Sequence, residues 1–104
     1  MGSKTVPSLL RAGAKTFELR NAIYGDNYKR IGKILVELFP DGFPAIRSVE
    51  EWNRWCLFLQ CLYKLTRYAA AAPQGHADSA HDLMVYAAML EELTSEQRRR
   101  KRKR

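Results

Sequence analysis

The sequence has few of the residues that break regular structure or crosslink a chain. Its 104 residues include only 6 glycines, 4 prolines and 2 cysteines. So few turn-forming residues favour long regular elements over many short strands. Cys56 and Cys61 are five positions apart in one predicted helix and point to different faces, which argues against a disulfide between them. We therefore expect two reduced thiols.

Long apolar runs and familiar catalytic motifs are also lacking. No stretch approaches the roughly 20 apolar residues that span a bilayer, and the N-terminus "MGSKTVPSLL" has no apolar region of a signal peptide. We expect a cytoplasmic protein without a membrane partner. The sequence contains no GxSxG, P-loop or GxGxxG motif and no CxxC pair. His76 and His81 lack the i, i+4 spacing of a zinc-binding helix, which argues against zinc.

Positive charge is concentrated at one end of the chain. The formal net charge is +7, but residues 98–104 hold 7 of the 18 basic side chains, so the remainder is neutral, with 11 basic and 11 acidic residues. We predict a helical domain over residues 1–97 and a disordered basic tail over residues 98–104. The tail could contact nucleic-acid phosphates without sequence choice, or simply solubilise the protein. It consists of Arg98, Arg99, Arg100, Lys101, Arg102, Lys103 and Arg104.

Apolar periodicity and capping residues predict four helices and no strand. In the first, Leu10 and Phe17 belong to the expected buried face. The third is the longest, and Ser48 with Glu51 predicts a capping box at its start. The fold class is therefore all-α, and short connections favour a four-helix bundle. The predicted helices cover about residues 7–23, 26–39, 49–72 and 78–97.

The start of the fourth helix, "GHADSAHD" (75–82), is unusually polar. Asp78 or Ser79 could be its N-cap, and Ser79 with Asp82 three residues later would form a second capping box. However, Asp78, Asp82 and Tyr86 follow at i, i+4 and i+8 and share a face that leads towards the core. A carboxylate on an apolar face needs a partner or a ligand.

Basic residues near the end of the third helix are the candidate partners of these acids. Lys64 and Arg67 lie at i, i+3 in "YKLTRYA", and a short connection folds that end back beside the fourth helix. They can therefore face Asp78 and Asp82 in one polar recess. The recess is either a salt-bridge cluster that fixes packing, or a pocket whose cations bind phosphate and whose acids could hold Mg²⁺.

A second polar junction is the segment "RNAIYGDNYKR" (20–30). Gly25 permits a sharp turn, and Asp26 or Asn27 can cap the following helix. The backbone amides of this corner, with Arg20 nearby, form a candidate anion cradle. Tyr24 or Tyr86 could stack on a base.

Three segments, "RNAIYGDNYKRIGKILVELFPDG", "KLTRYA" and "GHADSAHDLMVYAAMLEEL", resemble in this order a family of small bacteriophage proteins similar to phage nucleotide-modification-associated domains. The resemblance covers about residues 9–93. More remotely, the chain resembles the all-α nucleoside triphosphate pyrophosphatases of the MazG and dUTPase type, which hold Mg²⁺ with Glu-xx-Glu on one helix and Glu-xx-Asp on the next. Asp82, followed by Tyr86, matches the end of the second motif, but Ser79 replaces its Glu and the first motif is missing. The resemblance thus implies the fold without the catalysis.

We therefore expect a phage-encoded, non-catalytic nucleotide-binding protein in the infected bacterial host. It would sequester a host signalling nucleotide, such as a cyclic nucleotide, as an anti-defence protein, or support phage nucleotide metabolism. The alternatives are a Mg²⁺-dependent pyrophosphatase-like hydrolase, a nucleic-acid-associated accessory protein acting through its tail, and a purely structural protein. Small residues in "VYAAML" favour close helix approach and a homo-oligomer. The candidate ligand-binding residues are Arg20, Tyr24, Asn27, Lys64, Arg67, His76, Asp78, Asp82 and Tyr86, and Asp78 and Asp82 are also the candidate Mg²⁺ ligands.

Overall fold

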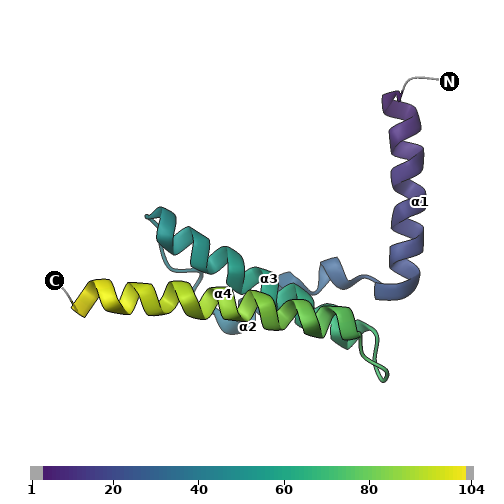
Figure 1. Ribbon diagram of the computed structural model, residues 1–104. Helices are drawn as coiled ribbons and strands as arrows, with labels where there is room; N and C mark the ends of the chain where they lie inside the picture. Colours follow the sequence, from purple (N-terminus) through teal and green to yellow (C-terminus); the bar gives the residue numbers. More distant parts are fainter. Residues whose placement is uncertain (1–3, 103–104) are drawn as a thin grey trace.

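The computed structural model describes residues 4–102, and this part of the chain is helical without strands, as predicted (Figure 1). No helix within it is long and apolar enough to cross a bilayer. The elements are α1 (Val6–Tyr24), the short 3-10 helix η1 (Asn27–Lys29), α2 (Ile31–Leu38), α3 (Val49–Ala70) and α4 (Ala77–Arg102).

Local sequence signals determine where these helices begin and end. Thr5 caps α1, because its side-chain oxygen accepts a hydrogen bond from the backbone N–H of Ser8 at 3.3 Å. Gly25 ends α1 with a φ of +60°, a conformation that glycine adopts at little cost. The predicted N-cap of α3 is confirmed, since Ser48 Oγ accepts from the backbone N–H of Glu51 at 3.1 Å. The Glu51 carboxylate accepts in turn from the Ser48 hydroxyl.

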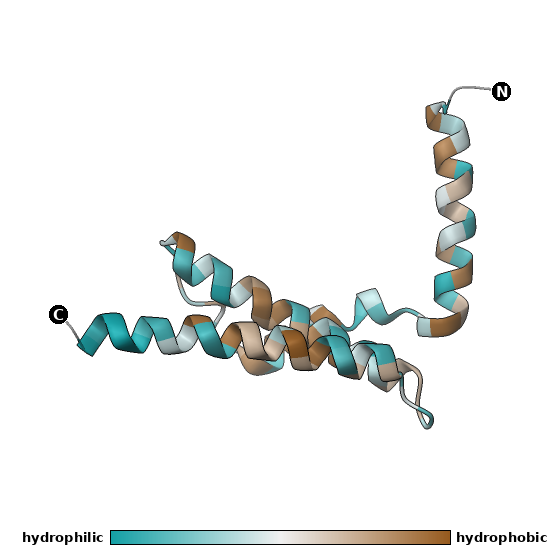
Figure 2. Cartoon of the chain, viewed as in Figure 1, coloured by the Kyte–Doolittle hydropathy of each residue, from teal (hydrophilic) through white to brown (hydrophobic). Residues whose placement is uncertain are grey.

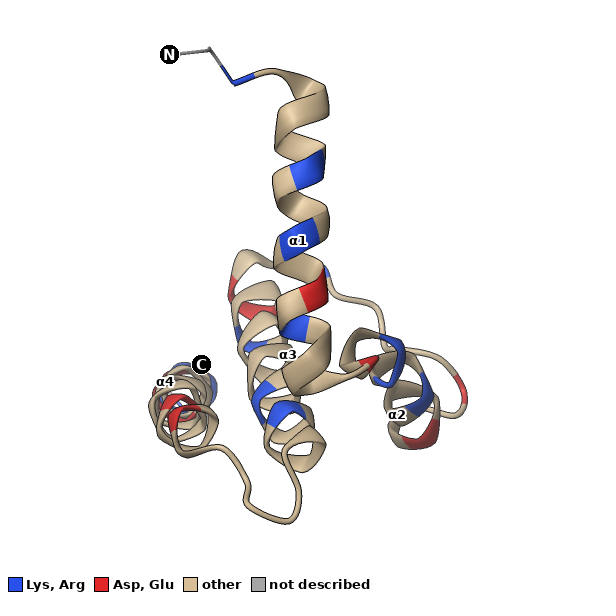
Figure 3. Ribbon diagram, turned by 90° about the vertical axis from the view of Figure 1, so that its right-hand side faces the viewer, with Lys and Arg blue, Asp and Glu red and all other residues tan. Residues whose placement is uncertain are grey.

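Helix α3 lies at the centre of the arrangement. Helix α4 runs antiparallel beside it, and α2 packs on another side (Figures 1 and 3). An aromatic cluster, defined here as Phe39, Phe43, Trp55 and Phe58, joins the end of α2 to α3. Its rings meet edge to face with centroids 4.7 to 6.2 Å apart, and each such pair contributes about 0.5–1.5 kcal/mol beyond its buried area.

Helix α1 stands away from the other three helices (Figure 1). It buries no residue, and the face that we expected to be covered is open: Leu10 is 69% exposed and Phe17 50%. Its contacts with the rest of the chain are made near the corner at its C-terminal end. The expected four-helix bundle is therefore not confirmed within one chain: α3 and α4 pack along each other, whereas α1 and α2 each meet α3 only locally.

Little of the chain is buried. Ile31, at 7% exposure, is the one buried hydrophobic residue in the described part of the chain. The accessible surface is 8591 Å², whereas a compact protein of 12.0 kDa exposes about 6000 Å². The radius of gyration is 18.2 Å, against about 13 Å for a compact domain of this length. A single chain thus leaves many large hydrophobic residues exposed, and Figure 2 shows hydrophobic positions along α1, which stands apart.

The basic end of α4 is helical as far as Arg102, where we expected a disordered tail from Arg98 onwards. Arginine and lysine are good helix formers, and their charges are favourable at a helix C-terminus. The side chains of this end are exposed, and Arg100 Nη1 lies 3.7 Å from Glu50 Oε1 at the start of α3. The expected disorder is not confirmed for residues 98–102, and residues 103 and 104 of the predicted tail lie outside the described residues.

Candidate functional site

The polar start of α4 is capped by His76, rather than by Asp78 or Ser79 as predicted. The backbone N–H of Ser79 donates to His76 Nδ1 at 3.2 Å, and Ser79 Oγ lies 2.7 Å from the same nitrogen. A ring nitrogen without a proton accepts as the oxygen of an ordinary N-cap does. Gly75, with a φ of +77°, lets the chain enter the helix earlier than we expected. Ser79 is consequently buried, and Asp78 is exposed.

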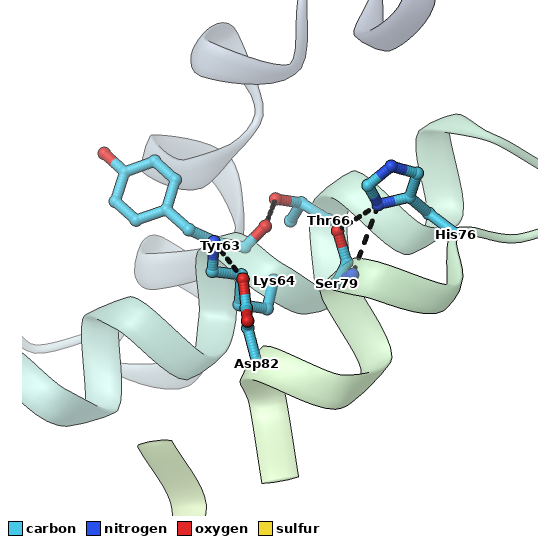
Figure 4. A network of polar contacts seen from close by, with 6 residues as sticks. All are labelled: Tyr63, Lys64, Thr66, His76, Ser79 and Asp82. Atoms are coloured by element: carbon cyan, nitrogen blue, oxygen red, sulfur yellow. Dashed lines mark hydrogen bonds and ion pairs between the residues drawn. The ribbon is translucent and has the colours of Figure 1, made fainter. Parts of the chain in front are cut away.

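Lys64 and Asp82 form an ion pair across the contact between α3 and α4 (Figure 4). Lys64 Nζ lies 3.2 Å from Asp82 Oδ2, and the side chains are 12% and 47% exposed, respectively. The ammonium group also lies 5.9 Å from the centre of the Tyr86 ring, within the range of a cation–π interaction. These three residues therefore satisfy one another and tie the two helices together.

Arg67 is directed to a different part of the molecule. Its guanidinium carbon lies 5.3 Å from the centre of the Tyr24 ring at the end of α1, and the same ring meets His76 edge to face at 5.8 Å. Tyr63 is one helical turn before Arg67 and so shares its side of α3. Figure 4 shows the Tyr63 ring pointing away from Asp82 and α4.

The structure does not bring together the four groups that we expected to share one recess. Lys64 and Asp82 neutralise each other, Asp78 is exposed and forms no ion pair with any residue from 4 to 102, and Arg67 lies at another surface. Helical spacing placed the two cations within one turn, but each long side chain reaches a different partner. The predicted polar recess is therefore wrong: Lys64 and Asp82 form an ion pair, and Arg67 lies apart from them.

This arginine lines a cleft of ≈ 250 Å³ between the end of α1, η1 and α3. Arg20 and Arg67 both line it, and neither forms an ion pair with another residue of the described chain. With Tyr24 and Asn27, four of the candidate ligand-binding residues meet here, and His76 touches Tyr24 from outside. The cleft lining consists of Phe17, Arg20, Asn21, Tyr24, Gly25, Asn27, Tyr28, Tyr63 and Arg67.

Asn27 is the polar residue of the cleft with the least access to solvent. It is 6% exposed, and its Oδ1 has no hydrogen-bond partner among the described residues. An unsatisfied buried acceptor costs about 1–3 kcal/mol, so a bound donor would stabilise the structure. The residue does not cap α2, as one alternative had predicted, because η1 intervenes between it and Ile31.

Asp26 holds the corner on which this cleft depends. Asn21 Nδ2 donates to Asp26 Oδ1 at 3.1 Å, and Lys29 Nζ lies 3.4 Å from Asp26 Oδ2. The Asn21 hydrogen bond and, after it, Lys29 lower the pKa of Asp26, while Asp26 raises the pKa of Lys29. The ionised carboxylate therefore links the last turn of α1 to η1, the two elements that carry Arg20 and Asn27.

Sequence reasoning missed several residues of the cleft, namely Phe17, Asn21, Tyr28 and Tyr63. We had assigned Phe17 to an apolar face that packs against other helices. A usable signal was the spacing of these residues, since Phe17 lies four residues before Asn21 and Tyr63 four residues before Arg67. These two mixed aromatic and polar faces converge because the chain turns at Gly25.

Comparison of the chain with protein-family models, curated proteins and solved structures found no match. Among residues 4–102 there is no group of three or more His, Cys, Asp or Glu side chains that could hold a metal ion. Asp78 and Asp82 stay a sequence-based prediction as Mg²⁺ ligands. What the geometry brings together is a cationic and aromatic cleft.

Proposed function

We propose that the protein is a non-catalytic, phage-encoded protein that binds a nucleotide in the cleft between α1, η1 and α3. The observation that carries this proposal is the buried, unsatisfied oxygen of Asn27 beside two arginines that form no ion pair in the described chain. Guanidinium groups bind phosphate oxygens in a bidentate manner. Asn27 lines this cleft, and its buried oxygen would accept from the amino group of a base or from a ribose hydroxyl once the side chain turns towards the ligand.

The aromatic residues of the cleft divide into two roles. Tyr24 is engaged by Arg67 and His76, so it orients the guanidinium group rather than a base. Tyr63 is 40% exposed, lines the cleft and offers a ring for stacking. The volume of ≈ 250 Å³ is just below the roughly 300–1,000 Å³ of usual ligand sites. The cleft therefore has room for part of one nucleotide, and the rest of the ligand, or the second half of a cyclic dinucleotide, would extend beyond it.

Calorimetric titration of the whole chain with nucleoside mono-, di- and triphosphates and cyclic dinucleotides tests the proposal. Arg67→Ala is expected to weaken binding of the best ligand about 10- to 100-fold, since a hydrogen bond to a charged group contributes about 1.5–3 kcal/mol. Arg47→Ala is the matched control, because Arg47 is exposed and does not line the cleft. Circular dichroism of each variant verifies the helical fold.

Asn27→Asp provides a second test within the same cleft. Aspartate has nearly the same size as asparagine but places a negative charge beside the phosphate-binding arginines. The affinity for the nucleotide should therefore fall at least as far as in Arg67→Ala. The nucleotide proposal is abandoned if no member of the panel binds, or if the Arg67 and Arg47 variants bind equally well.

The hydrolase alternative gains no comparable support. Asp82, which matches the pyrophosphatase motif by resemblance, is engaged by Lys64, and its counterpart Asp78 lies exposed four residues away. Hydrolysis of a nucleotide by metal ions needs several convergent carboxylates. The proposal therefore concerns binding and not turnover.

The basic end of α4 supports a second candidate function, contact with nucleic-acid phosphates. Residues 98–102 are exposed and form the last turns of α4. Their charges are therefore held close together on one helix. Each phosphate contact steepens the salt dependence of binding by about 0.9 in log–log slope on duplex DNA. Replacing Arg98, Arg99 and Lys101 with glutamine should therefore lower that slope by about 3 while leaving nucleotide affinity unchanged. An unchanged slope contradicts this candidate function.

A further inference from the structure

Two adjoining hollows form a groove along α4 that nothing in the described chain covers. The first, ≈ 440 Å³, lies between α2, α3 and α4 and is lined by three rings of the aromatic cluster. The second, ≈ 400 Å³, continues along α4 between Ala87 and Arg98. The two share Leu90 and Thr94, so they form one surface. Helices α2, α3 and α4 line the first hollow, and α4 alone lines the second. A fourth helix laid along α4 would cover both hollows.

Helix α1 has the complementary properties. Its outer apolar side chains are uncovered, with Val6 68% and Leu10 69% exposed. It is 19 residues long, which corresponds to about 28 Å, whereas the groove between Ala87 and Arg98 runs about 16 Å along α4. The helix is thus long enough to fill the groove.

Charged residues on both surfaces restrict how they can pair. Arg11 and Lys15 lie in the middle of α1, and Glu91, Arg98 and Arg54 line the hollows. Arg11, Lys15 and Glu91 form no ion pair with another residue between 4 and 102. The favoured register sets Glu91 opposite Arg11 or Lys15 and keeps the two arginines of the hollows away from them.

The excess surface of the single chain is at least as large as the area that each chain of an obligate homodimer buries. Each chain exposes about 2600 Å² more than a compact protein of its mass. Obligate homodimers bury about 2,000–5,000 Å² in total, or about half of that on each chain. We propose that two copies of this chain exchange their α1 helices, so that each α1 lies in the groove of the other copy. The exchange is reciprocal and therefore closes as a two-fold dimer.

The test measures the mass of the whole protein in solution by sedimentation or light scattering, with two variants. Leu10→Glu places a charge on the exchanged helix, and Ala87→Arg fills the groove. Both residues are exposed in the single chain, so neither change disturbs its own packing. Val36→Glu is the matched control, because Val36 is 65% exposed on α2 and lines neither hollow.

The wild-type protein and the Val36 variant should have twice the 12.0 kDa mass of the chain, and the other two variants should have the mass of one chain with unchanged helical content. Mixing the Leu10 and Ala87 variants should restore a dimer with one copy of each. In that mixture, the intact α1 of one chain meets the intact groove of the other. A monomeric wild type, a dimer that survives both substitutions, or a mixture that stays monomeric would each overturn the exchange.

Discussion

Removing the carboxylate of the Lys64–Asp82 ion pair should lower the stability more than removing its ammonium group. Asp82→Asn leaves an ammonium group whose side chain is only 12% exposed, without its carboxylate partner. Lys64→Met leaves a carboxylate that is 47% exposed and can be hydrated, while methionine fills the space of the lysine stem. We therefore expect Asp82→Asn to destabilise the protein clearly more than Lys64→Met.

The magnitudes follow from the exposure of the two groups. Breaking a fully buried pair from one side costs about 3–5 kcal/mol, whereas an exposed pair contributes about 0–1 kcal/mol. Because Asp82 is half exposed and solvent screens the pair, we expect a loss of about 1–2 kcal/mol for Asp82→Asn and below about 0.5 kcal/mol for Lys64→Met. In a domain of this size the first corresponds to a fall of roughly 4–16 °C in the melting temperature.

The assay is urea and thermal unfolding followed by circular dichroism, at one fixed protein concentration because association shifts the apparent stability. Asp78→Asn is the matched control, since Asp78 is an exposed carboxylate on the same helix that forms no ion pair in the described chain. It should change stability by less than about 0.5 kcal/mol. Equal losses for Asp82→Asn and Lys64→Met, or a larger loss for the latter, would refute the reasoning.

Three further predictions follow from single residues. Gly75→Ala should lower the free energy of unfolding by about 1–3 kcal/mol in urea, because its φ is +77° and a Cβ there would lie 2.5 Å from Cζ of Tyr68. His76→Ala should cost about 1 kcal/mol through loss of the α4 cap, and His76→Ser should recover most of it. Burial raises the pKa of the Cys61 thiol, so at pH 8 an alkylating reagent, with the products followed by mass spectrometry, should modify Cys61 more slowly than the exposed Cys56.

Each of these has an outcome that contradicts it. Gly13 has open space around it within α1, so Gly13→Ala should not destabilise; an equal loss at Gly75 and Gly13 would show that the Gly75 effect is not steric. A serine at position 76 that is no better than alanine would contradict capping. Equal alkylation rates at Cys61 and Cys56 would contradict the inferred effect of burial.

The elements were predictable because their signals are local. Ser48 followed by Glu51 and the absence of strand patterns depend only on neighbours in the chain. The partners of α1 were not predictable in the same way. An apolar stripe such as the one containing Leu10 indicates that a face is covered, but it does not say which helix, or which copy of the chain, covers it.

The site was partly predictable for a related reason. The corner segment, residues 20–30, supplied Arg20, Tyr24 and Asn27 to the candidate set, and the structure places them in one cleft. The pairing of the long cations depended on rotamers that helical spacing does not determine, so Arg67 was assigned to the wrong partners. The sequence did not predict His76 as the N-cap of α4, because serine and aspartate are the residues usually found at an N-cap.

The turn at Gly25 has a consequence for how the protein responds to its surroundings. One wall of the cleft, with Arg20, belongs to the last turn of α1, and the facing wall, with Arg67, belongs to α3. A rotation of the backbone at Gly25 would change the distance between the guanidinium groups of Arg20 and Arg67. If a nucleotide binds in the cleft as proposed, a contact that holds α1 in place would change the affinity for the nucleotide, and the bound nucleotide would change the affinity for that contact by the same free energy.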